Sequence, residues 1–356
     1  MRYIPRYCLT ENSVLAKSIL GARGEVLLEA GIKMTPRYIR RLEQLGIRGA
    51  FVDDPISEGI EIADAISDEL RSETIRLVSS IYTAPVRSHR SARSNALHMM
   101  RTAEQIVDDI IAHESTIVNL IDIKNYDAYT FFHCVNTTVL CVVIGLGMDL
   151  PRYELVDLAY ASLMHDVGKL FIDSAIINKP GKLTADEYDL VKTHAEEGYS
   201  YLKDKYLSSE MIARGALDHH ERISGNGYPD GKRGTEISLF GRIIGVADVY
   251  DALISDRPYR EGLFPVDAVA YIQGGADKDF DFDVVSVFSH KIAPFPVGTC
   301  VKLSDGNTGI VMENIEGFLT RPLLRVFKSC ENGIMPFELN LSEGSFDITI
   351  VEMLKI

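Results

Sequence analysis

Five of the nine histidines in this chain fall within residues 129–260, and two aspartates there are further candidate ligands. Five imidazoles and two carboxylates are enough to hold two metal ions that share a bridging group. A single histidine on an apolar helix is more often a hydrogen-bonded core residue than a ligand. Five of them among the helices of one domain would each need a buried partner, so a metal centre is favoured. The candidate ligands are His133, His165, Asp166, His194, His219, His220 and Asp248.

Four of these candidates form two pairs of neighbouring residues, and this restricts where an ion can lie. His165 and Asp166 follow an apolar helical stretch, and Gly168 then permits a sharp turn. Adjacent helical residues point about 100° apart, so both can be ligands only at a helix end or between two ions. His219 and His220 impose the same condition. The mixture of imidazole and carboxylate suits iron, manganese, zinc or nickel better than calcium or magnesium.

Composition limits the other possibilities. A length of 356 residues predicts two or three domains, and the net charge of −14 disfavours binding to DNA or RNA. The five cysteines are odd in number and form no CxxC pair, which fits a reducing cytoplasm. Residues 1–5 do not resemble a signal peptide, and the apolar run at 137–148 is too short to span a bilayer. We therefore expect a cytoplasmic protein without membrane insertion.

The pattern of elements predicts a mainly α protein, a helical bundle flanked by two small modules. Residues 1–57 form an α+β module, 58–115 a helical connector, 116–292 the catalytic bundle and 293–356 a β-rich module. Thr35 and Pro36 predict a helix start in the first module, and Thr184 with Glu187 predicts a capping box in the bundle. The helices are expected at 60–81, 96–111, 129–147, 154–164, 184–202, 208–218, 238–254, 265–272 and 279–291.

The two flanking modules are expected to contain the strands. Alternating apolar residues and turn signals predict β-structure at 14–19, 25–28, 50–52, 299–303, 309–313, 323–327 and 347–353. The basic stretch 87–93 lacks interleaved aromatic residues and is interpreted as a solvated connector. The helices within 58–115 could still mediate dimerisation or contact a signalling partner.

Several motifs occur in the order of a known family. Residues 165–169 (HDVGK) resemble the HD motif of the HD-domain metal-dependent phosphohydrolases. His219-His220-Glu221, followed by GNGYP at 225–229, resembles the HHE…GxGYP signature of the HD-GYP subfamily, as do DVYDAL at 248–253 and RPYR at 257–260. The resemblance extends over residues 122–290, about half of the chain.

The resemblance implies a specific assignment of ligands. Asp166 would bridge two ions; His133, His165 and Asp248 would complete one site, and His194, His219 and His220 the other. Some members of the subfamily bind a third ion through a glutamate one turn before the first histidine, where this chain has Tyr129. Two ions are therefore expected, with iron or manganese favoured by the resemblance.

The resemblance also implies the reaction, hydrolysis of cyclic diguanylate to pGpG, with GMP as a further product left open. Two cations about 3.5–4 Å apart can hold a bridging hydroxide, which would attack the phosphodiester. Lys169 would stabilise the phosphate charge, and Arg257 and Arg260 would bind the second phosphate unless they are surface arginines. Gly227 and Tyr228 would contact substrate or a partner, although a structural turn is an equal interpretation from the residues alone.

Two other functions fit the same residues. One is hydrolysis of another cyclic dinucleotide or a nucleotide, because we identify no guanine-specific contact in the sequence. The other is a sensor that binds the dinucleotide without turnover and signals through the helices of 58–115 or the GYP loop.

Overall fold

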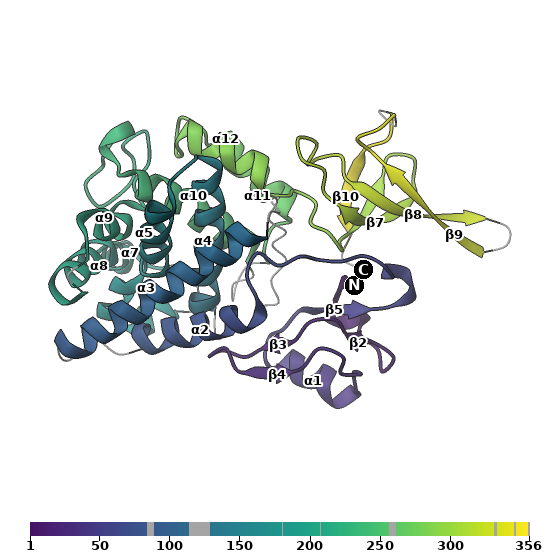
Figure 1. Cartoon of the computed structure of the whole chain (residues 1–356), viewed down its shortest axis with the longest axis horizontal. Helices are drawn as coiled ribbons and strands as arrows, with labels where there is room; N and C mark the ends of the chain where they lie inside the picture. The colour runs from purple at the N-terminus through teal and green to yellow at the C-terminus, as the bar shows by residue number, and fades with distance from the viewer. Residues whose placement is uncertain are drawn as a thin grey trace.

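The structure is a computed structural model that describes residues 1–83, 89–113, 129–179, 181–206, 208–255, 261–330, 333–344 and 347–354. A helical bundle occupies one side of the molecule, and the two small modules lie next to each other on the other side (Figure 1). The expected class is confirmed: a mainly α chain with an α+β module before the bundle and a β-rich module after it.

The bundle is built around α4, which is mostly apolar and mostly buried. Helices from the expected connector and from the catalytic segment share one hydrophobic core, in which Ile75, Met99, Leu140 and Ile244 are fully buried. Residues 68–82 and 89–112, expected to form a connector, are therefore packed into the bundle. The helices are α2 (Asp68–Tyr82), α3 (His89–Ala112), α4 (Tyr129–Gly147), α5 (Arg152–Leu163), α6 (Ser174–Ile177), α7 (Ala185–Lys192), α8 (His194–Tyr201), α9 (Glu210–Asp218), α10 (Leu239–Ile254), α11 (Pro265–Gly274) and α12 (Phe282–Lys291).

Helix α4 has the expected bounds, but its apolar stretch is longer than the run expected at 137–148. Thr130–Gly147 gives an 18-residue window with a mean hydropathy of 1.7, long and apolar enough to cross a membrane by composition. In the bundle, 78% of that window is buried. The segment is longer than the run expected from sequence, and its burial against neighbouring helices explains its apolar character.

Most helix boundaries follow the capping residues. Thr184 accepts from the backbone N–H of Glu187, whose side chain accepts from that of Thr184, so the expected capping box is present. Three expectations were wrong. The helix expected at 60–81 begins only at Asp68, capped by Ser67, and the helix expected at 184–202 is interrupted at Thr193 to give α7 and α8. The helix expected at 96–111 begins already at His89, so residues 89–93 of the basic stretch are helical.

The N-terminal module combines two small sheets with one helix. The strands are β1 (Arg2–Pro5), β2 (Val14–Leu15), β3 (Ile19–Leu20), β4 (Val26–Leu28) and β5 (Gly49–Asp53), and β5 pairs antiparallel with both β1 and β2. Helix α1 (Pro36–Gln44) begins as expected, with Thr35 accepting from the N–H of Tyr38. Leu15, Met34 and Leu42 form the buried core of this module.

The C-terminal module is one antiparallel sheet in the order β10-β6-β7-β8-β9. Strand β9, which pairs along its whole length with β8, was not expected from the sequence. The strands are β6 (Cys300–Leu303), β7 (Thr308–Glu313), β8 (Leu323–Cys330), β9 (Gly333–Asn340) and β10 (Ile350–Leu354).

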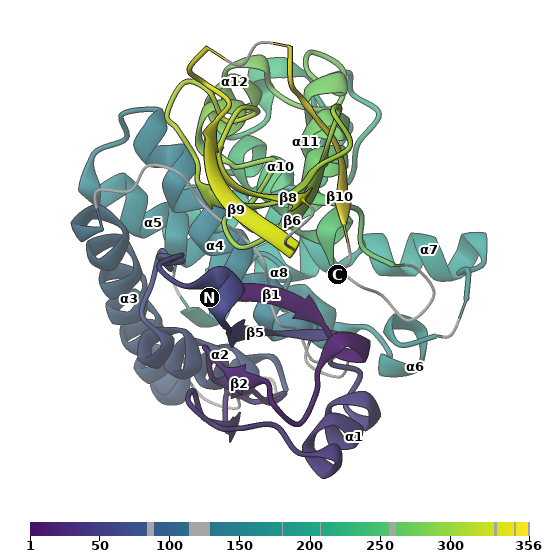
Figure 2. The same ribbon diagram turned by 90° about the vertical axis from the view of Figure 1, so that its right-hand side faces the viewer.

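The two terminal modules share a hydrophobic core. Phe51 and Ile62 pack with Val301 and Leu324 from the C-terminal sheet, and Figure 2 shows that sheet resting against β1 and β5. The backbone N–H of Tyr3 also donates to the carbonyl of Gly298 at 3.2 Å. The chain ends therefore fold onto each other outside the bundle.

Candidate metal centre

The structure brings the seven candidate ligands together from five places in the bundle. His133 lies on α4 and Asp248 on α10, whereas the others lie at helix ends: His165 and Asp166 after α5, His194 at the start of α8, and His219 and His220 after α9. The possible ligand atoms of Asp166, His194, His219 and His220 all lie within 4.8 Å of one another. The same holds for those of His133, His165 and Asp248.

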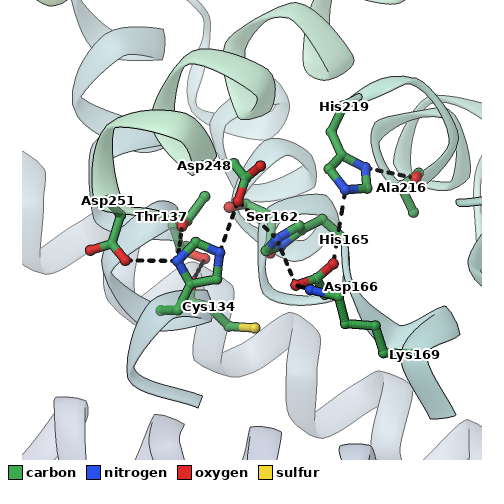
Figure 3. A network of polar contacts seen from close by, with 12 residues as sticks. Cys134, Thr137, Ser162, His165, Asp166, Lys169, Ala216, His219, Asp248 and Asp251 are labelled. Carbon is green, nitrogen blue, oxygen red and sulfur yellow. Dashed lines mark hydrogen bonds and ion pairs between the residues drawn. The ribbon is translucent and has the colours of Figure 1, made fainter. Parts of the chain in front are cut away.

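Asp166 lies between the two groups. Its Oδ1 is 3.4 Å from Nε2 of His194 and 3.9 Å from Nε2 of His219. Its Oδ2 is 3.5 Å from Nε2 of His165 and forms an ion pair with Lys169. One carboxylate oxygen therefore faces each group (Figure 3).

Three of the histidines are oriented by the helices that they follow. Nδ1 of His165, His194 and His219 lies 2.7, 2.7 and 2.8 Å from the carbonyl oxygen three residues earlier. Carbonyls in the last turn of a helix lack the regular N–H donor and can accept from a side chain. Nδ1 therefore carries the proton and donates, which leaves the lone pair of Nε2 directed into the centre.

This arrangement fits a cation. Nε2 of His194 and Nε2 of His219 face each other at 3.4 Å, and with both Nδ1 atoms protonated neither nitrogen can donate to the other. Within the described part of the chain, the buried atoms Nε2 of His165 and Oδ1 of Asp166 have no hydrogen-bond partner. Buried polar atoms without partners are costly, and a metal ion would satisfy all of them. Imidazole and carboxylate donors suit iron, manganese or zinc.

His133 is oriented differently, by a side chain of another helix. Its Nδ1 lies 2.7 Å from Oδ2 of Asp251, and its Nε2 lies 2.9 Å from Oδ1 of Asp248 (Figure 3). Asp251, whose role the sequence left open, is fully buried and follows Asp248 by one turn of α10. A carboxylate behind a ligand histidine is a common device for fixing the ring and its tautomer.

Burial and charge separate the protonation behaviour of the histidines. Burial lowers the pKa of His165, His194 and His219, and lowers that of His220 to about 3. For His133 burial opposes protonation, but the hydrogen bonds to Asp248 and Asp251 outweigh it and raise the pKa to about 9.

The carboxylates respond in the opposite sense. Burial alone would raise the pKa of Asp166, but Lys169 and the surrounding imidazoles hold it well below its usual range. His165, His194, His219 and His220 are therefore predisposed to stay neutral and Asp166 to stay ionised, which are the forms that bind metal.

Gly168 allows the two sides of the centre to approach. A Cβ atom at this position would lie 1.9 Å from the carbonyl oxygen of His194 and 2.6 Å from the backbone nitrogen of Gly198. No side chain fits there, so the turn after Asp166 packs directly against α8.

A pocket of about 340 Å³ opens onto the centre and is lined by metal-ligand candidates and by residues that the sequence did not single out. Lys169 and Tyr228, expected at the substrate site, both line it. Arg222 and Thr130 also line it and were missed. Arg222 directly follows the HHE motif, and this position could have identified it from the sequence. Its guanidinium donates to the carbonyl of Glu221 at 2.9 Å and lies over the ring of Phe280.

The GYP loop is fastened to the centre by Glu221. Its buried carboxylate accepts from the backbone N–H of Asp230 at 2.8 Å and of Lys232 at 3.0 Å. Gly227 contributes backbone only, because a Cβ there would lie 2.4 Å from the backbone of Glu221 and of Arg222. Tyr228 then stacks on His220, with ring centroids 4.6 Å apart.

Three expectations lie outside the described residues. Arg257 and Arg260, expected to bind the second phosphate, belong to residues 256–260. The side chain of Tyr129, which replaces the optional glutamate, is also not among those that the structure describes. Gly227 itself lies behind Tyr228 in the loop and is not among the residues lining the pocket.

Comparison with known proteins identifies related sequences. The HD domain profile matches residues 94–284, more than half of the chain, and begins on α3 rather than at the expected residue 122. A cyclic di-GMP phosphodiesterase of Pseudomonas aeruginosa is 34% identical over 274 residues, 76% of this chain and 66% of that protein. The cyclic di-GMP phosphodiesterase response regulator RpfG of Xanthomonas campestris is 30% identical over 239 residues, 64% of this chain and 62% of that protein.

A third relative carries a different substrate in its name. The 3'3'-cGAMP-specific phosphodiesterase 3 of Vibrio cholerae is 31% identical over 251 residues, 70% of this chain and 47% of that protein. The matched region thus spans between about half and two thirds of the length of these relatives. A solved structure of an HDG"Y"P protein from Bdellovibrio bacteriovorus, 15% identical, superposes with a TM-score of 0.51 and covers 81% of this chain and 97% of that chain. This likeness shows a shared fold.

Proposed function

The chain belongs to the HD-domain family, in its HD-GYP subfamily, and from this premise we propose that it is a metal-dependent phosphodiesterase that hydrolyses cyclic diguanylate. Two relatives named as cyclic di-GMP phosphodiesterases match 76% and 64% of this chain. The pocket beside the centre supports an enzyme more than a structural protein, because it combines ligand candidates with the cation Lys169.

The observation that carries the proposal is the position of Asp166. Its two oxygens face two separate groups of imidazoles, and one of these oxygens is buried without a hydrogen-bond partner in the described chain. We propose that Asp166 would be a ligand shared by two ions, with His133, His165 and Asp248 holding one and His194, His219 and His220 the other. When bound, the ions would supply Lewis-acid chemistry that lowers the pKa of water and polarises a phosphodiester.

The chain's own residues would bind and orient the substrate around that pair. Lys169 lies at the pocket wall and pairs with Asp166, so its ammonium is held where negative charge develops on the phosphate. Tyr228 presents a ring fixed by stacking on His220, suited to contact with a base or ribose. Arg222 adds a second cation to the wall, and Arg257 and Arg260 remain proposed ligands of the second phosphate.

Cyclic GMP-AMP is a second candidate substrate, because one matched relative is named for that specificity. The shared phosphodiester chemistry would be identical, and only contacts to the bases would distinguish the two. Iron or manganese is proposed as the metal, and pGpG, with GMP as a further product, is proposed for cyclic diguanylate.

The test measures metal content and turnover together on the full chain. The protein is loaded anaerobically with Fe²⁺ or with Mn²⁺, analysed for bound metal, and given cyclic diguanylate and cyclic GMP-AMP separately. We expect two ions per chain and linear product from cyclic diguanylate. His194→Ala should lose metal and turnover, whereas His290→Ala, an exposed histidine on α12, should keep both.

The outcomes separate the alternatives. Faster hydrolysis of cyclic GMP-AMP would reassign the substrate and keep the reaction. Binding of cyclic diguanylate by metal-loaded protein without any product would identify a sensor and overturn the proposed activity.

A further inference from the structure

A line of buried polar side chains connects helix α2 to His133. Nη1 of Arg71 donates to Oδ1 of Asn136 at 2.8 Å, and Nδ2 of Asn136 donates to Oδ1 of Asp251 at 3.1 Å. Oδ2 of Asp251 then lies 2.7 Å from Nδ1 of His133. These residues come from α2, α4 and α10, and all four are buried, Asn136 and Asp251 completely.

The chemistry of the groups gives this line a direction. A guanidinium only donates hydrogen bonds and a carboxylate only accepts them. The Asn136 amide between them can satisfy both neighbours in one orientation, with its oxygen towards Arg71 and its NH₂ towards Asp251. Arg71 therefore orients the amide, and the amide donates to one oxygen of Asp251. The other oxygen accepts from His133 at 2.7 Å and from the hydroxyl of Ser255 at 3.3 Å.

The last step determines which nitrogen of His133 can bind an ion. Asp251 accepts from Nδ1–H, so Nε2 is the nitrogen that faces Asp248 and the centre, 2.9 Å from its Oδ1. If the Asn136 amide turned over, its oxygen would face Asp251, and two acceptors would meet in a buried place. Loss of Arg71 removes one of the two groups that oppose this rotation and leaves Asp251 as the other.

The N-terminal module contacts α2 next to Arg71 and helps to hold the helix with Arg71 pointing into the core. Oγ of Ser72 donates to the carbonyl of Gly24 at 2.6 Å, in the turn between β3 and β4. Gly24 has a φ of +76°, and a Cβ there would lie 2.5 Å from the carbonyl of Ser72. The turn therefore rests directly on the backbone of α2, next to Arg71.

We propose that Arg71 is a positioning residue of the metal centre, acting through Asn136 and Asp251 on the orientation of His133. Arg71 lies before residue 94, where the HD domain match begins, so this contribution comes from outside the matched domain. The inference rests on the proposed function only in requiring that His133 is a metal ligand. Its effect is specific to the ion held by His133, His165 and Asp248.

The test is a titration of the metal-free full chain with Co²⁺, whose visible spectrum reports the ligands around each ion. The wild type should take up two ions. Arg71→Met should weaken one of them by about tenfold to a hundredfold, the range typical for groups that orient metal ligands, and leave the other within about threefold. Arg71→Lys, which keeps the charge and a donor, should lose less. The spectrum of His133→Ala identifies which ion is affected.

The matched control is Arg76→Met, the same substitution at an exposed position on the same helix, which should bind both ions like the wild type. Asn136→Ala breaks the same line in the middle and decides the matter if Arg71→Met does not fold. The double variant should be no weaker than the weaker single variant, because both changes interrupt one path.

The proposal is overturned if Arg71→Met and Asn136→Ala bind both ions like the wild type, or if both ions weaken equally. Wild-type protein that binds no ion would instead overturn the proposed function, and this inference with it.

Discussion

The histidines of the centre are oriented in two different ways, three of them by backbone carbonyls and His133 by a side chain. His165, His194 and His219 donate to carbonyl oxygens three residues earlier in their own chain segment, at 2.7 to 2.8 Å. His133 lies in the second turn of α4 and is held by Asp251, which is 118 residues away in the sequence. The first kind of support is local and comes with the end of a helix. The second exists only when α4 and α10 are packed together.

This difference predicts how each group tolerates change. A backbone carbonyl cannot be removed by substitution, so the local group is vulnerable mainly through the packing of its helix ends. The side chains behind His133 can be changed one at a time, so its support can be weakened in steps.

The largest expected effect comes from Asp166, which faces both sets of ligand candidates. Asp166→Ala should abolish turnover, by at least about a thousandfold, and remove both ions, because one oxygen faces each group. Elemental analysis and product assays measure this. Asp157→Ala on α5, a half-buried aspartate outside the centre, is the matched control and should keep both. Retention of both ions by Asp166→Ala would show that the groups are independent.

The next largest effect concerns the packing of the turn after Asp166 against His194. Gly168→Ala should lower the free energy of unfolding by about 3 kcal/mol and weaken the ion near His194, because the added methyl would lie 1.9 Å from the His194 carbonyl. Urea unfolding and metal titration measure the two effects. Gly274→Ala, where nothing lies within 4 Å of the new Cβ, should change neither. An unchanged Gly168→Ala protein would mean that α8 can shift without cost.

In the metal-free chain, the free energy of unfolding should decrease both at acidic and at alkaline pH, and different histidines should cause the two decreases. The local histidines and His220 have pKa values lowered by burial, that of His220 to about 3, so unfolding takes up protons below the unfolded pKa of about 6.5. The free energy of unfolding should therefore fall as the pH drops from 7 to 5. Each such group contributes up to about 1.4 kcal/mol per pH unit.

His133 acts in the other direction. Its folded pKa, raised to about 9, gives stability that is complete below the unfolded value and is lost as the pH rises through 9. Unfolding of the chelated protein between pH 5 and pH 9.5 should show both limbs. His133→Gln should flatten the alkaline limb and leave the acidic one. An alkaline limb that survives this substitution would have to come from another group.

The smallest effect separates the neighbours of His133. Oγ1 of Thr137 is 3.5 Å from Nδ1 of His133, whereas Oδ2 of Asp251 is 2.7 Å from the same atom. Thr137→Val keeps the shape and removes the hydroxyl, and it should change metal affinity less than about threefold, since a contact this long is weak. A larger loss would mean that the hydroxyl shares in orienting the ring.

Much of the site could be anticipated because its signals are local. His165 and His219 stand at the ends of apolar helices, where last-turn carbonyls need donors, and Gly168 and Gly227 stand where a Cβ has no room. The capping residues Thr35 and Thr184 marked two helix starts correctly. Strand β9 follows β8 directly in the sequence and was missed because Pro336 weakens its strand pattern. The break at Thr193 was missed because the turn into His194 depends on packing against Gly168, which is distant in sequence.

The sequence alone identified the imidazoles and carboxylates that the structure brings together, and indicated that His165 and His219 follow apolar helices. A helix end orients its own side chains through its own backbone, so this information is present in adjacent residues. Only the tertiary structure decided how His133 is held and that Arg71, on a helix expected to be a connector, reaches it. Hydrogen bonds between side chains of three helices depend on packing angle and depth, which no stretch of sequence records.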